Sequence, residues 1–490
     1  MTKRPHIIIF NPDQWRGDVL GYAGNPAAVT PNLDQWVQTD AVGFRHAFCQ
    51  SPVCTPSRCS FMTGWYPHVH GHRTMFHMLR PHEPMLLRSL KQAGYFVWWG
   101  GKNDVVPAQY GFDKYCHVKY EPPEGGGHPY THLNWRGDPD GDNYYSFYVG
   151  RIEKPEGAPY AYDSDWGHIE GALEFLKNLP PTVRDGETPL CLYLPLEYPH
   201  PPYAVEDPWH NMIDREKLPP RVLPPEGWRG KPAILAGIYE HQRMHNWDEA
   251  RWTELRATYY GMCARVDYQF GLVLDALKEA GIYDDAAIFF FADHGEYAGD
   301  YGIVEKAQNT FEDCLVNVPF AIKPPKTYAI EPHVNTALVE LTDFSATVEA
   351  LACITPQHTH FGRNLLPLMQ SKAETWRDAV FSQGGALPQD AHLHDAPYEE
   401  GHLYGPRLRF QSGEDMRNLK ATMLRTAHYK YVHRLGDTDE LYDLQEDPTE
   451  RNNRIDDPTL KAVREQLRER LLRFYLETGD VVPHDLDKRW

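Results

Sequence analysis

Short, uninterrupted apolar runs that alternate with longer amphipathic stretches constrain the fold of this chain more than any other feature. Four such runs lie at 7–10, 96–99, 192–194 and 287–291, and each is bounded by polar or turn residues. Runs of this kind are typical of strands buried on both faces. At 252–280, apolar residues recur at helical spacing until a glycine ends the run. Strands that alternate with helices predict an α/β fold with a large, mostly parallel central sheet flanked by helices. In such sheets the chemistry lies at the carboxyl ends of the strands.

The length and the change of pattern along the chain predict two domains. The chain has 490 residues, more than one compact domain usually holds, and its pattern changes near 362–376. We predict a catalytic α/β domain at 1–375 and a smaller α+β subdomain at 376–490. Stretches rich in Pro, Gly, Trp and Tyr are interpreted as ordered insertions over the catalytic face, at 120–160 and 200–250. The subdomain is predicted to contain three short strands and a final helix, at 379–381, 422–424, 429–432 and about 457–476.

Charge and cysteine usage exclude several classes of protein. A formal net charge of -19 argues against nucleic acid or an anionic membrane as the main partner. The N-terminal apolar run is too short for a signal peptide and lacks a cleavage site, and no other run is long enough to span a bilayer. Eight cysteines without C-x-x-C pairs favour reduced thiols. We therefore predict a soluble, cytoplasmic protein.

Polar side chains follow two of the predicted strands directly. Asp13 and Gln14 come after the first strand, and Asp293 and His294 come after the run at 287–291. Carboxylate and amide oxygens suit Ca²⁺ or Mg²⁺, and a histidine can complete the shell. Either pair alone is as typical of a strand-ending turn or a helix cap. Together, at the ends of two strands, they predict a metal site.

Residues 54–58 read Cys-Thr-Pro-Ser-Arg and run on to a Thr-Gly-Trp-Tyr-Pro turn at 63–67. Alone, this motif is also compatible with a buried, unmodified cysteine at a helix start. Further motifs are Gly-Gly-Lys-Asn-Asp at 100–104, Tyr-Pro-His-Pro-Pro at 198–202, a stretch from Asp-His-Gly to a lysine at 293–306, and Leu-Tyr-Asp-Leu at 441–444. With all of these, the chain resembles the formylglycine-dependent (type I) sulfatase family of the alkaline phosphatase superfamily over nearly its whole length.

The resemblance implies a nucleophile and a metal centre. Cys54 would be converted to formylglycine, whose hydrated aldehyde attacks with one hydroxyl and releases the ester by elimination through the other. One divalent metal ion is expected, with Ca²⁺ favoured and Mg²⁺ or Mn²⁺ as alternatives. Its implied ligands are Asp13, Gln14, the converted Cys54, Asp293 and His294.

The resemblance also implies roles in charge stabilisation and proton transfer. Arg58 would orient the diol, since its planar fork suits paired acceptors. Lys102 and Lys306 would bind ester oxygens as charge develops. His200 would give a proton to the leaving oxygen. The predicted catalytic set is Cys54, Arg58, Lys102, Asp104, His200 and Lys306.

Two positions depart from the sulfatase pattern. Gln14 stands where sulfatases usually carry a second acidic residue, and an Asp-Gln pair also occurs in related phosphonate monoester and phosphodiester hydrolases. Asp104 stands in place of the histidine that draws the proton from the second diol hydroxyl. Asp104 could accept that proton, hold Lys102 in place, or contact a cationic or hydroxyl-rich part of the substrate. Lys102 favours sulfate esters.

We therefore predict a sulfatase that hydrolyses a sulfate monoester to an alcohol and inorganic sulfate. Hydrolysis of phosphonate monoesters or phosphodiesters at the same site is the alternative, and a non-catalytic binding protein ranks third. The expected partners are a small-molecule or saccharide sulfate ester, a formylglycine-generating enzyme during maturation, and further copies of the chain in a homo-oligomer. A dense basic cluster without clean ligand spacing is interpreted as substrate contacts or plain surface: His68, His70, His72, Arg73 and His77. Of these, His70 and Arg73 are candidates for residues of the substrate pocket.

Overall fold

A mixed central sheet organises the computed structural model, which describes residues 4–123, 127–371, 376–390, 392, 401–412, 417–482 and 488–489. Within these residues the sheet has nine strands in the order β11-β2-β10-β8-β1-β6-β3-β4, and β9 pairs with β2. The strands span His6–Asn11 (β1), Val42–Phe48 (β2), Phe96–Gly100 (β3), Val118–Tyr120 (β4), Leu190–Pro195 (β6), Ala286–Phe291 (β8), Asn317–Val318 (β9), Phe320–Lys323 (β10) and His333–Glu340 (β11).

The four strands predicted from apolar runs, β8, β1, β6 and β3, are adjacent and parallel at the centre of the sheet. Their branched and aromatic side chains suit a pleated surface buried on both faces, and β1, β6 and β8 are buried throughout. Strand β10 runs antiparallel to both of its neighbours, and β9 runs antiparallel to β2. Because β1 and β8 run in parallel, their carboxyl ends lie at the same edge. The fold prediction is confirmed.

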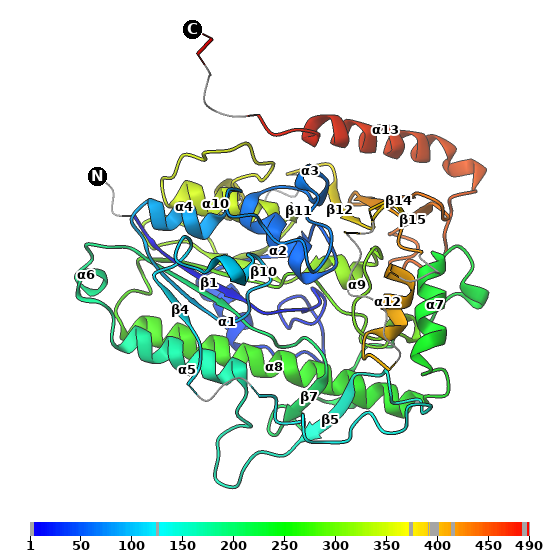
Figure 1. Cartoon of the computed structure of the whole chain (residues 1–490), viewed down its shortest axis with the longest axis horizontal. Coiled ribbons are helices and arrows are strands. Elements are labelled where there is room, and N and C mark those ends of the chain that lie inside the picture. The colour runs from blue at the N-terminus through cyan, green and yellow to red at the C-terminus, as the bar shows by residue number, and fades with distance from the viewer. Residues whose placement is uncertain are drawn as a thin grey trace.

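Helices cover both faces of this sheet (Figure 1). Helix α8 is the longest described helix and lies along one face with α5, while α2, α4 and α10 lie on the other. The predicted helix at 252–280 is α8, which ends at Glu279 just before Gly281, whose φ of 71° stops the helix. The helices of this domain span Pro31–Thr39 (α1), Cys54–Thr63 (α2), Pro67–His70 (α3), Leu86–Gln92 (α4), Ser164–Lys177 (α5), Pro181–Arg184 (α6), Ala233–Gln242 (α7), Glu249–Glu279 (α8), Asp313–Val316 (α9), Thr342–Leu351 (α10) and Leu366–Met369 (α11).

The two predicted insertions meet in a small second sheet. Strand β5 (Tyr148–Ile152) from the first insertion pairs in parallel with β7 (Tyr203–Glu206) from the second. The second insertion also forms α7, a helix that the sequence pattern did not predict. Both insertions are therefore ordered over most of their length, as expected.

The C-terminal part forms an antiparallel sheet in the order β12-β13-β14-β15. These strands span Val380–Gly384, Ala421–Arg425, Tyr429–Arg434 and Glu440–Asp443, and they contain the three predicted strands. Helix α13 (Lys461–Thr478) packs Leu467, Leu471 and Phe474 into a separate hydrophobic cluster, and α12 spans Gly405–Ser412. The predicted domain boundary adjoins residues 372–375, which lie outside the described residues.

Two further expectations concern thiols and membranes. All eight cysteines lie in described parts of the chain and are free of disulfide bonds. Within the described residues, none of the helices combines the length and the apolar character that crossing a membrane requires.

Candidate active site

The end of β1 carries the first part of the site. Asn11 closes the strand and donates from Nδ2 to the Phe291 carbonyl of β8 at 2.8 Å. Asp13 follows and is fully buried. Gln14 adopts a left-handed φ of 68°, and its backbone N–H donates to Asp293 Oδ1 at 3.0 Å. The turn after β1 is thereby fastened to the turn after β8.

The end of β8 carries the second part. Asp293 Oδ1 also accepts the N–H of His294 at 2.9 Å. His294 Nδ1 lies 2.9 Å from the Gly295 carbonyl, an arrangement in which Nδ1 carries the proton and Nε2 is left as a lone-pair donor. Position 295 needs glycine because an added Cβ would lie 2.0 Å from the Cys314 carbonyl oxygen.

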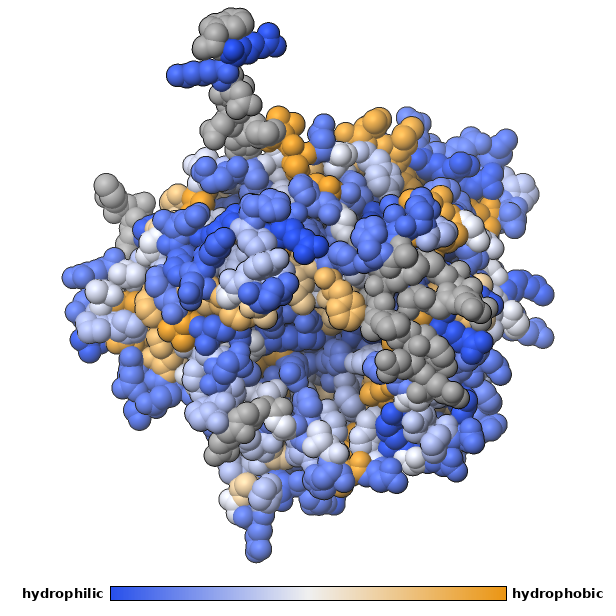
Figure 2. Space-filling model, viewed as in Figure 1, coloured by the Kyte–Doolittle hydropathy of each residue, from blue (hydrophilic) through white to orange (hydrophobic). Residues whose placement is uncertain are grey.

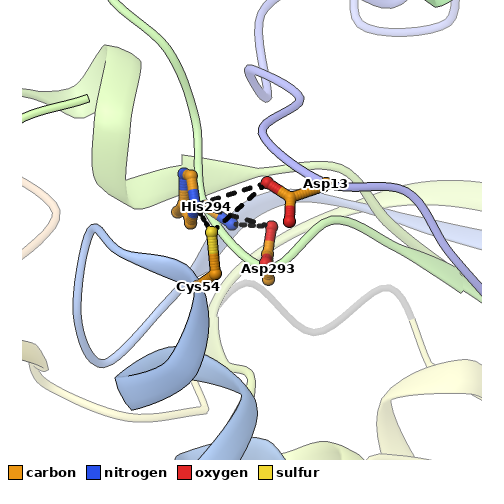
Figure 3. Close-up of side chains that lie close together, drawn as sticks. All are labelled: Asp13, Cys54, Asp293 and His294. Atoms are coloured by element: carbon orange, nitrogen blue, oxygen red, sulfur yellow. Dashed lines mark hydrogen bonds and ion pairs between the residues drawn. The ribbon is translucent and has the colours of Figure 1, made fainter. Parts of the chain in front are cut away.

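Cys54 is the first residue of α2 and points into this cluster (Figure 3). Its Sγ lies 3.1 Å from His294 Nε2 and 3.5 Å from Asp13 Oδ1. Candidate ligand atoms of Asp13, Cys54, Asp293 and His294 all lie within 4.8 Å of one another. Burial raises the pKa of the Cys54 thiol far above its ordinary value, and the Asp13 carboxylate raises it further. As a free cysteine, Cys54 is thus held as the unreactive thiol.

Arg58, one turn further along α2, links the two acidic residues. Its Nε donates to Asp293 Oδ2 at 2.9 Å, and an Nη atom donates to Asp13 Oδ2 at 3.1 Å. The other Nη donates to Asn11 Oδ1 at 3.0 Å, and the whole side chain is buried. The guanidinium therefore occupies the outer oxygens of both carboxylates and leaves their Oδ1 atoms facing Cys54 and His294.

Lys102 approaches the same carboxylate from the end of β3. Its Nζ lies 2.6 Å from Asp13 Oδ2, 3.0 Å from Asp104 Oδ2 and 3.7 Å from Cys54 Sγ. Gly101 has a φ of 116°, and an added Cβ would lie 2.0 Å from the Pro195 carbonyl oxygen. That glycine lets the turn after β3 pass close to β6 and carry Lys102 to the site. Asp104 pairs with Lys102 rather than with the metal cluster.

Lys306 and His200 form the remaining side of the site. Lys306 Nζ lies 2.9 Å from His200 Nε2, 2.9 Å from Gln14 Oε1 and 2.6 Å from Glu305 Oε1. His200 Nδ1 lies 2.5 Å from the Pro201 carbonyl, so Nδ1 carries the proton and Nε2 accepts from Lys306. Burial lowers the pKa of His200 well below its ordinary value, and the positive Lys306 lowers it further. His200 is therefore a neutral imidazole at rest.

A cavity of about 700 Å³ opens beside these groups. Figure 2 shows a mainly hydrophilic face with a hollow near its centre. The described residues that line the cavity come from both predicted insertions, from the segment after α3 and from the C-terminal part: Met75, Phe76, Met78, Lys102, Asp104, His128, Tyr130, Glu197, His200, Pro201, Pro202, Lys306, His402, Tyr404, Arg407 and Leu408.

The structure brings the predicted site residues together, but the side chain of Gln14 contacts Lys306 and Glu296 and not the metal cluster. Gln14 adjoins the metal cluster through its backbone, while its amide bonds Lys306 through Oε1 and Glu296 through Nε2. Burial and the nearby Glu305 raise the pKa of Glu296 to about 7. Gln14 thus joins the cluster to the lysine.

The basic cluster at 68–77 differs from its interpretation as substrate contacts or plain surface. His70 Nδ1 and His72 Nε2 each lie 3.0 Å from a carboxylate oxygen of Glu83, and His72 and Arg73 are buried. None of the five is among the described residues that line the cavity. His70 and His72 thus pair with an acidic residue that follows them in sequence, and His68 Nδ1 contacts Gln383, so the density of the cluster reflects packing within the protein.

Several residues at the site were missed by sequence reasoning. Asn11 lies two residues before Asp13 and Glu305 directly precedes Lys306, so closeness in sequence to predicted residues is a signal that could have found them. Tyr404 and Arg407 come from the C-terminal part, and no pattern in the sequence ties them to the catalytic face. Arg407 reaches the site through Glu305 Oε2 at 3.2 Å.

The donor set suits a hard divalent cation. The outer oxygens of Asp13 and Asp293 are occupied by Arg58, whereas Asp13 Oδ1 contacts the Cys54 thiol at 3.5 Å and meets no N–H donor among the described hydrogen bonds. A buried carboxylate oxygen that accepts only a weak thiol donor, beside a second carboxylate and an imidazole nitrogen, is a favourable position for Ca²⁺ or Mg²⁺.

Comparison with known proteins assigns the chain to a protein family. The family model described as Sulfatase matches residues 5–354, and one described as N-sulphoglucosamine sulphohydrolase, C-terminal, matches residues 409–476. The chain belongs to the sulfatase family, within the alkaline phosphatase superfamily, and is a sulfuric ester hydrolase.

Three similar proteins span nearly the whole chain. The multifunctional alkaline phosphatase superfamily protein PehA of Trinickia caryophylli is 26% identical over 97% of this chain and 96% of its own length. The ulvan-active sulfatase of Formosa agariphila is 25% identical over 97% of this chain and 82% of its own. The structure of the phosphonate monoester hydrolase SpPMH from Silicibacter pomeroyi superposes with a TM-score of 0.74 and 24% identity, over 98% of this chain and 96% of that one.

Proposed function

We propose that the chain hydrolyses a sulfate monoester to an alcohol and inorganic sulfate at a formylglycine made from Cys54, with one divalent metal ion, in the first place Ca²⁺. The position of Cys54 Sγ carries the proposal: it lies 3.1 Å from His294 Nε2, 3.5 Å from Asp13 Oδ1 and 3.7 Å from Lys102 Nζ. The sulfur stands where a formylglycine oxygen would lie. A nucleophile there lies between a cation site and an anion-binding lysine.

The metal ligands would be Asp13, Gln14, Asp293, His294 and the oxygen at position 54. Formylglycine would supply, as its hydrated aldehyde, the hydroxyl that attacks sulfur, and the metal would polarise that hydroxyl and a sulfate oxygen. Arg58 orients the two carboxylates, since it donates to both at 2.9 and 3.1 Å.

Lys102 and Lys306 would bind the remaining sulfate oxygens. Lys102 is largely buried and Lys306 is buried, so the charge that develops on sulfate would meet cations already in place. Lys102 is held by Asp13 and Asp104, and Lys306 is held by Glu305. These carboxylates fix the two ammonium groups before substrate enters.

His200 would move the proton that the leaving oxygen requires. Its Nε2 lies 2.9 Å from Lys306 Nζ, beside the expected position of the ester, and the proton lost by the attacking hydroxyl would balance the one that Nε2 gives to the departing alcohol. Because the pKa of His200 lies well below its ordinary value, the imidazole gives up a proton readily once it has received one. The sulfur–oxygen bond to the alcohol would then break, loss of the proton from the second hydroxyl at position 54 would expel inorganic sulfate, and water would rehydrate the aldehyde.

Asp104 remains the candidate acceptor for the elimination step. Its Oδ2 lies 3.0 Å from Lys102 Nζ, and this contact supports a role in holding the lysine as well. A histidine at this position would test the two roles against each other, because it can accept a proton but cannot form an ion pair with a lysine.

Phosphonate monoester or phosphodiester hydrolysis is the second candidate. The neutral amide of Gln14 favours it, because one negative charge fewer at the metal would suit a phosphorus ester as well as a sulfate ester. PehA is described as multifunctional, which fits a site that accepts both elements.

The substrate, location and partners belong to the same proposal. The ulvan-active sulfatase acts, by its name, on a sulfated polysaccharide, which supports a saccharide ester beside a small-molecule ester as substrate. The eight free cysteines support a cytoplasmic location. A formylglycine-generating enzyme would be the partner during maturation. Further copies of the chain would be partners in a homo-oligomer, which light scattering tests.

The test compares three chromogenic esters on protein produced with a formylglycine-generating enzyme: 4-nitrophenyl sulfate, bis(4-nitrophenyl) phosphate and 4-nitrophenyl phenylphosphonate. We expect sulfate hydrolysis to dominate, to stop after chelation and to return with Ca²⁺. Cys54→Ala should abolish it. The matched control is Cys59→Ala, because Cys59 is also buried on α2 but lies outside the cluster.

Two results would contradict the proposal. Turnover that survives Cys54→Ala would remove the nucleophile from the mechanism. Dominant phosphodiester or phosphonate turnover would favour the second candidate and make Gln14→Asp the next variant. The mass of the peptide that contains residue 54 separates a failure of maturation from a failure of catalysis.

A further inference from the structure

The cavity is larger than a sulfate group needs. Of its volume of about 700 Å³, the part beside Lys102, His200 and Lys306 would take the sulfate. The rest is bounded by residues from the segment after α3, from the first insertion and from α12, and none of these belongs to the proposed catalytic set. This remainder must receive the alcohol that leaves.

Large apolar side chains dominate this remainder. Met75, Phe76 and Met78 line it together, and Phe76 is 61% exposed although it is an aromatic residue. Tyr404 lines it as well and is held by the ring of Phe147, with centroids 5.2 Å apart. When an apolar group covers an exposed phenylalanine beside flexible thioethers, water leaves the surface and the free energy falls.

The charged groups on the cavity wall are already paired within the protein. Asp104 Oδ2 lies 3.0 Å from Lys102, and Glu197 Oε2 lies 3.1 Å from His128 Nε2. Burial alone would lower the pKa of His128, but the hydrogen bond and charge of Glu197 raise it, so the carboxylate favours the charged imidazolium beside it. Arg407 likewise pairs with Glu305 at 3.2 Å.

This pairing decides which alcohols the wall can accept. A second sulfate or a carboxylate on the substrate would be held best by a free cation, and a quaternary ammonium, which also binds aromatic faces, would be held best where a carboxylate is free. Among the described lining residues outside the proposed catalytic set, Arg407 pairs with Glu305, and Glu197 lies beside His128. A charged group on the leaving alcohol would have to compete with these contacts, which reduces what it gains by binding there.

We propose that the leaving group is an uncharged alcohol with a compact apolar body, which packs against Phe76 and Met78 while its monoanionic sulfate ester occupies the catalytic centre. The inference rests on the proposed function and narrows its substrate class. It places hydrophobic alcohol sulfates ahead of polysulfated saccharides and of sulfate esters of cationic alcohols.

Four primary alkyl sulfates of similar intrinsic reactivity test this order: cyclohexylmethyl sulfate, glucose 6-sulfate, choline sulfate and glucosamine 2-N,6-O-disulfate. We expect kcat/KM for cyclohexylmethyl sulfate to exceed each of the others by about tenfold or more, the range that a few apolar contacts provide. A kcat/KM for any of the other three that equals or exceeds it overturns the proposal.

Phe76→Ala tests the surface itself. We expect kcat/KM for cyclohexylmethyl sulfate to fall about three- to tenfold, mainly through KM, while the value for glucose 6-sulfate stays the same. The matched control is Tyr110→Ala, because Tyr110 is 60% exposed and does not line the cavity. An equal loss for both esters, or no loss at all, contradicts a role for Phe76 in holding the alcohol.

Met78→Lys adds a cation without a partner to the same wall. Its kcat/KM for the disulfate should rise relative to cyclohexylmethyl sulfate, and an unchanged ratio would count against the charge argument.

A binding measurement separates this inference from the proposed function. Cyclohexylmethanol should bind the Cys54→Ala protein in calorimetry, and the Cys54→Ala/Phe76→Ala protein should bind it several-fold more weakly. If no ester is turned over by matured protein, the proposed function fails, and calorimetry still decides the subsite. Equal binding by the two proteins overturns it.

Discussion

Replacement of Arg58 by methionine would remove the buried cation that joins the turns after β1 and β8. The side chain is fully buried and donates to Asp293 at 2.9 Å, to Asp13 at 3.1 Å and to Asn11 at 3.0 Å. Methionine keeps much of the volume and removes the charge, so the expected effect comes from the two carboxylates left behind.

The magnitude follows from what each carboxylate keeps. A hydrogen bond to a charged group contributes about 1.5–3 kcal/mol, and breaking a buried ion pair costs about 3–5 kcal/mol. Asp13 retains Lys102 at 2.6 Å, and Asp293 retains the backbone N–H groups of Gln14 and His294. We therefore expect the free energy of unfolding to fall by about 3–5 kcal/mol.

The pH dependence has a definite sign. Burial alone would raise the pKa of Asp13, but Lys102, His200 and Arg58 together hold it well below its ordinary value. A lowered pKa contributes stability above the unfolded value of about 3.9 and loses it as pH falls through the folded value. Without Arg58 this contribution shrinks, so the deficit should be fully present above about pH 4 and should become smaller as pH falls below that value.

Urea unfolding followed by tryptophan fluorescence, with a chelator present, measures this change. The control is Arg470→Met, which breaks a surface pair with Asp378 whose side chains are 21% and 62% exposed and should cost less than about 1 kcal/mol. If Arg58→Met costs no more than this control, buried charge does not hold the two turns together, and the reasoning is refuted.

Three further variants test other parts of the structure. Gly101→Ala should lower kcat by at least about tenfold, because its Cβ would collide with the Pro195 carbonyl and displace Lys102; an unchanged rate would show that the turn can adjust. Asp104→His should recover part of the activity lost in Asp104→Ala if the carboxylate accepts the elimination proton, and a steady-state assay showing no recovery would assign it to holding Lys102. Burial raises the pKa of Asp267 to about 7, so the protein should lose stability as pH rises from about 4 to 7 and this buried carboxyl is deprotonated. In Asp267→Asn the melting temperature should fall less over this pH range. A pH profile of the melting temperature equal to that of the wild type would contradict this prediction.

The central sheet could be predicted because its strands leave a strong local signal. Runs such as 7–10 and 287–291 are apolar on both faces and short, and they form adjacent parallel strands. Strand order and the reversed strand β10 could not be predicted, because pairing depends on contacts between distant segments. Helix α7 was missed because prolines and glycines around it mask its period.

The candidate site was predictable only where chemistry lies in local motifs. Asp13, Cys54 and Asp293 follow strands or begin a helix, so position and residue type point to them together. Tyr404 reaches the cavity from the C-terminal part, a contact that only the folded chain defines. His70 and His72 gave the opposite error, because their partner, Glu83, is unremarkable in the sequence.

The complete burial of Cys54 sets an order of events in the life of the chain. Its side chain lies beneath Lys102, between the turns that follow β1 and β8, and has no exposed surface. Any enzyme that modifies this thiol must therefore act while α2 is still accessible, during synthesis or before the sheet closes over it. Protein that folds unmodified would be trapped in that form, and later addition of the modifying enzyme would not activate it without unfolding.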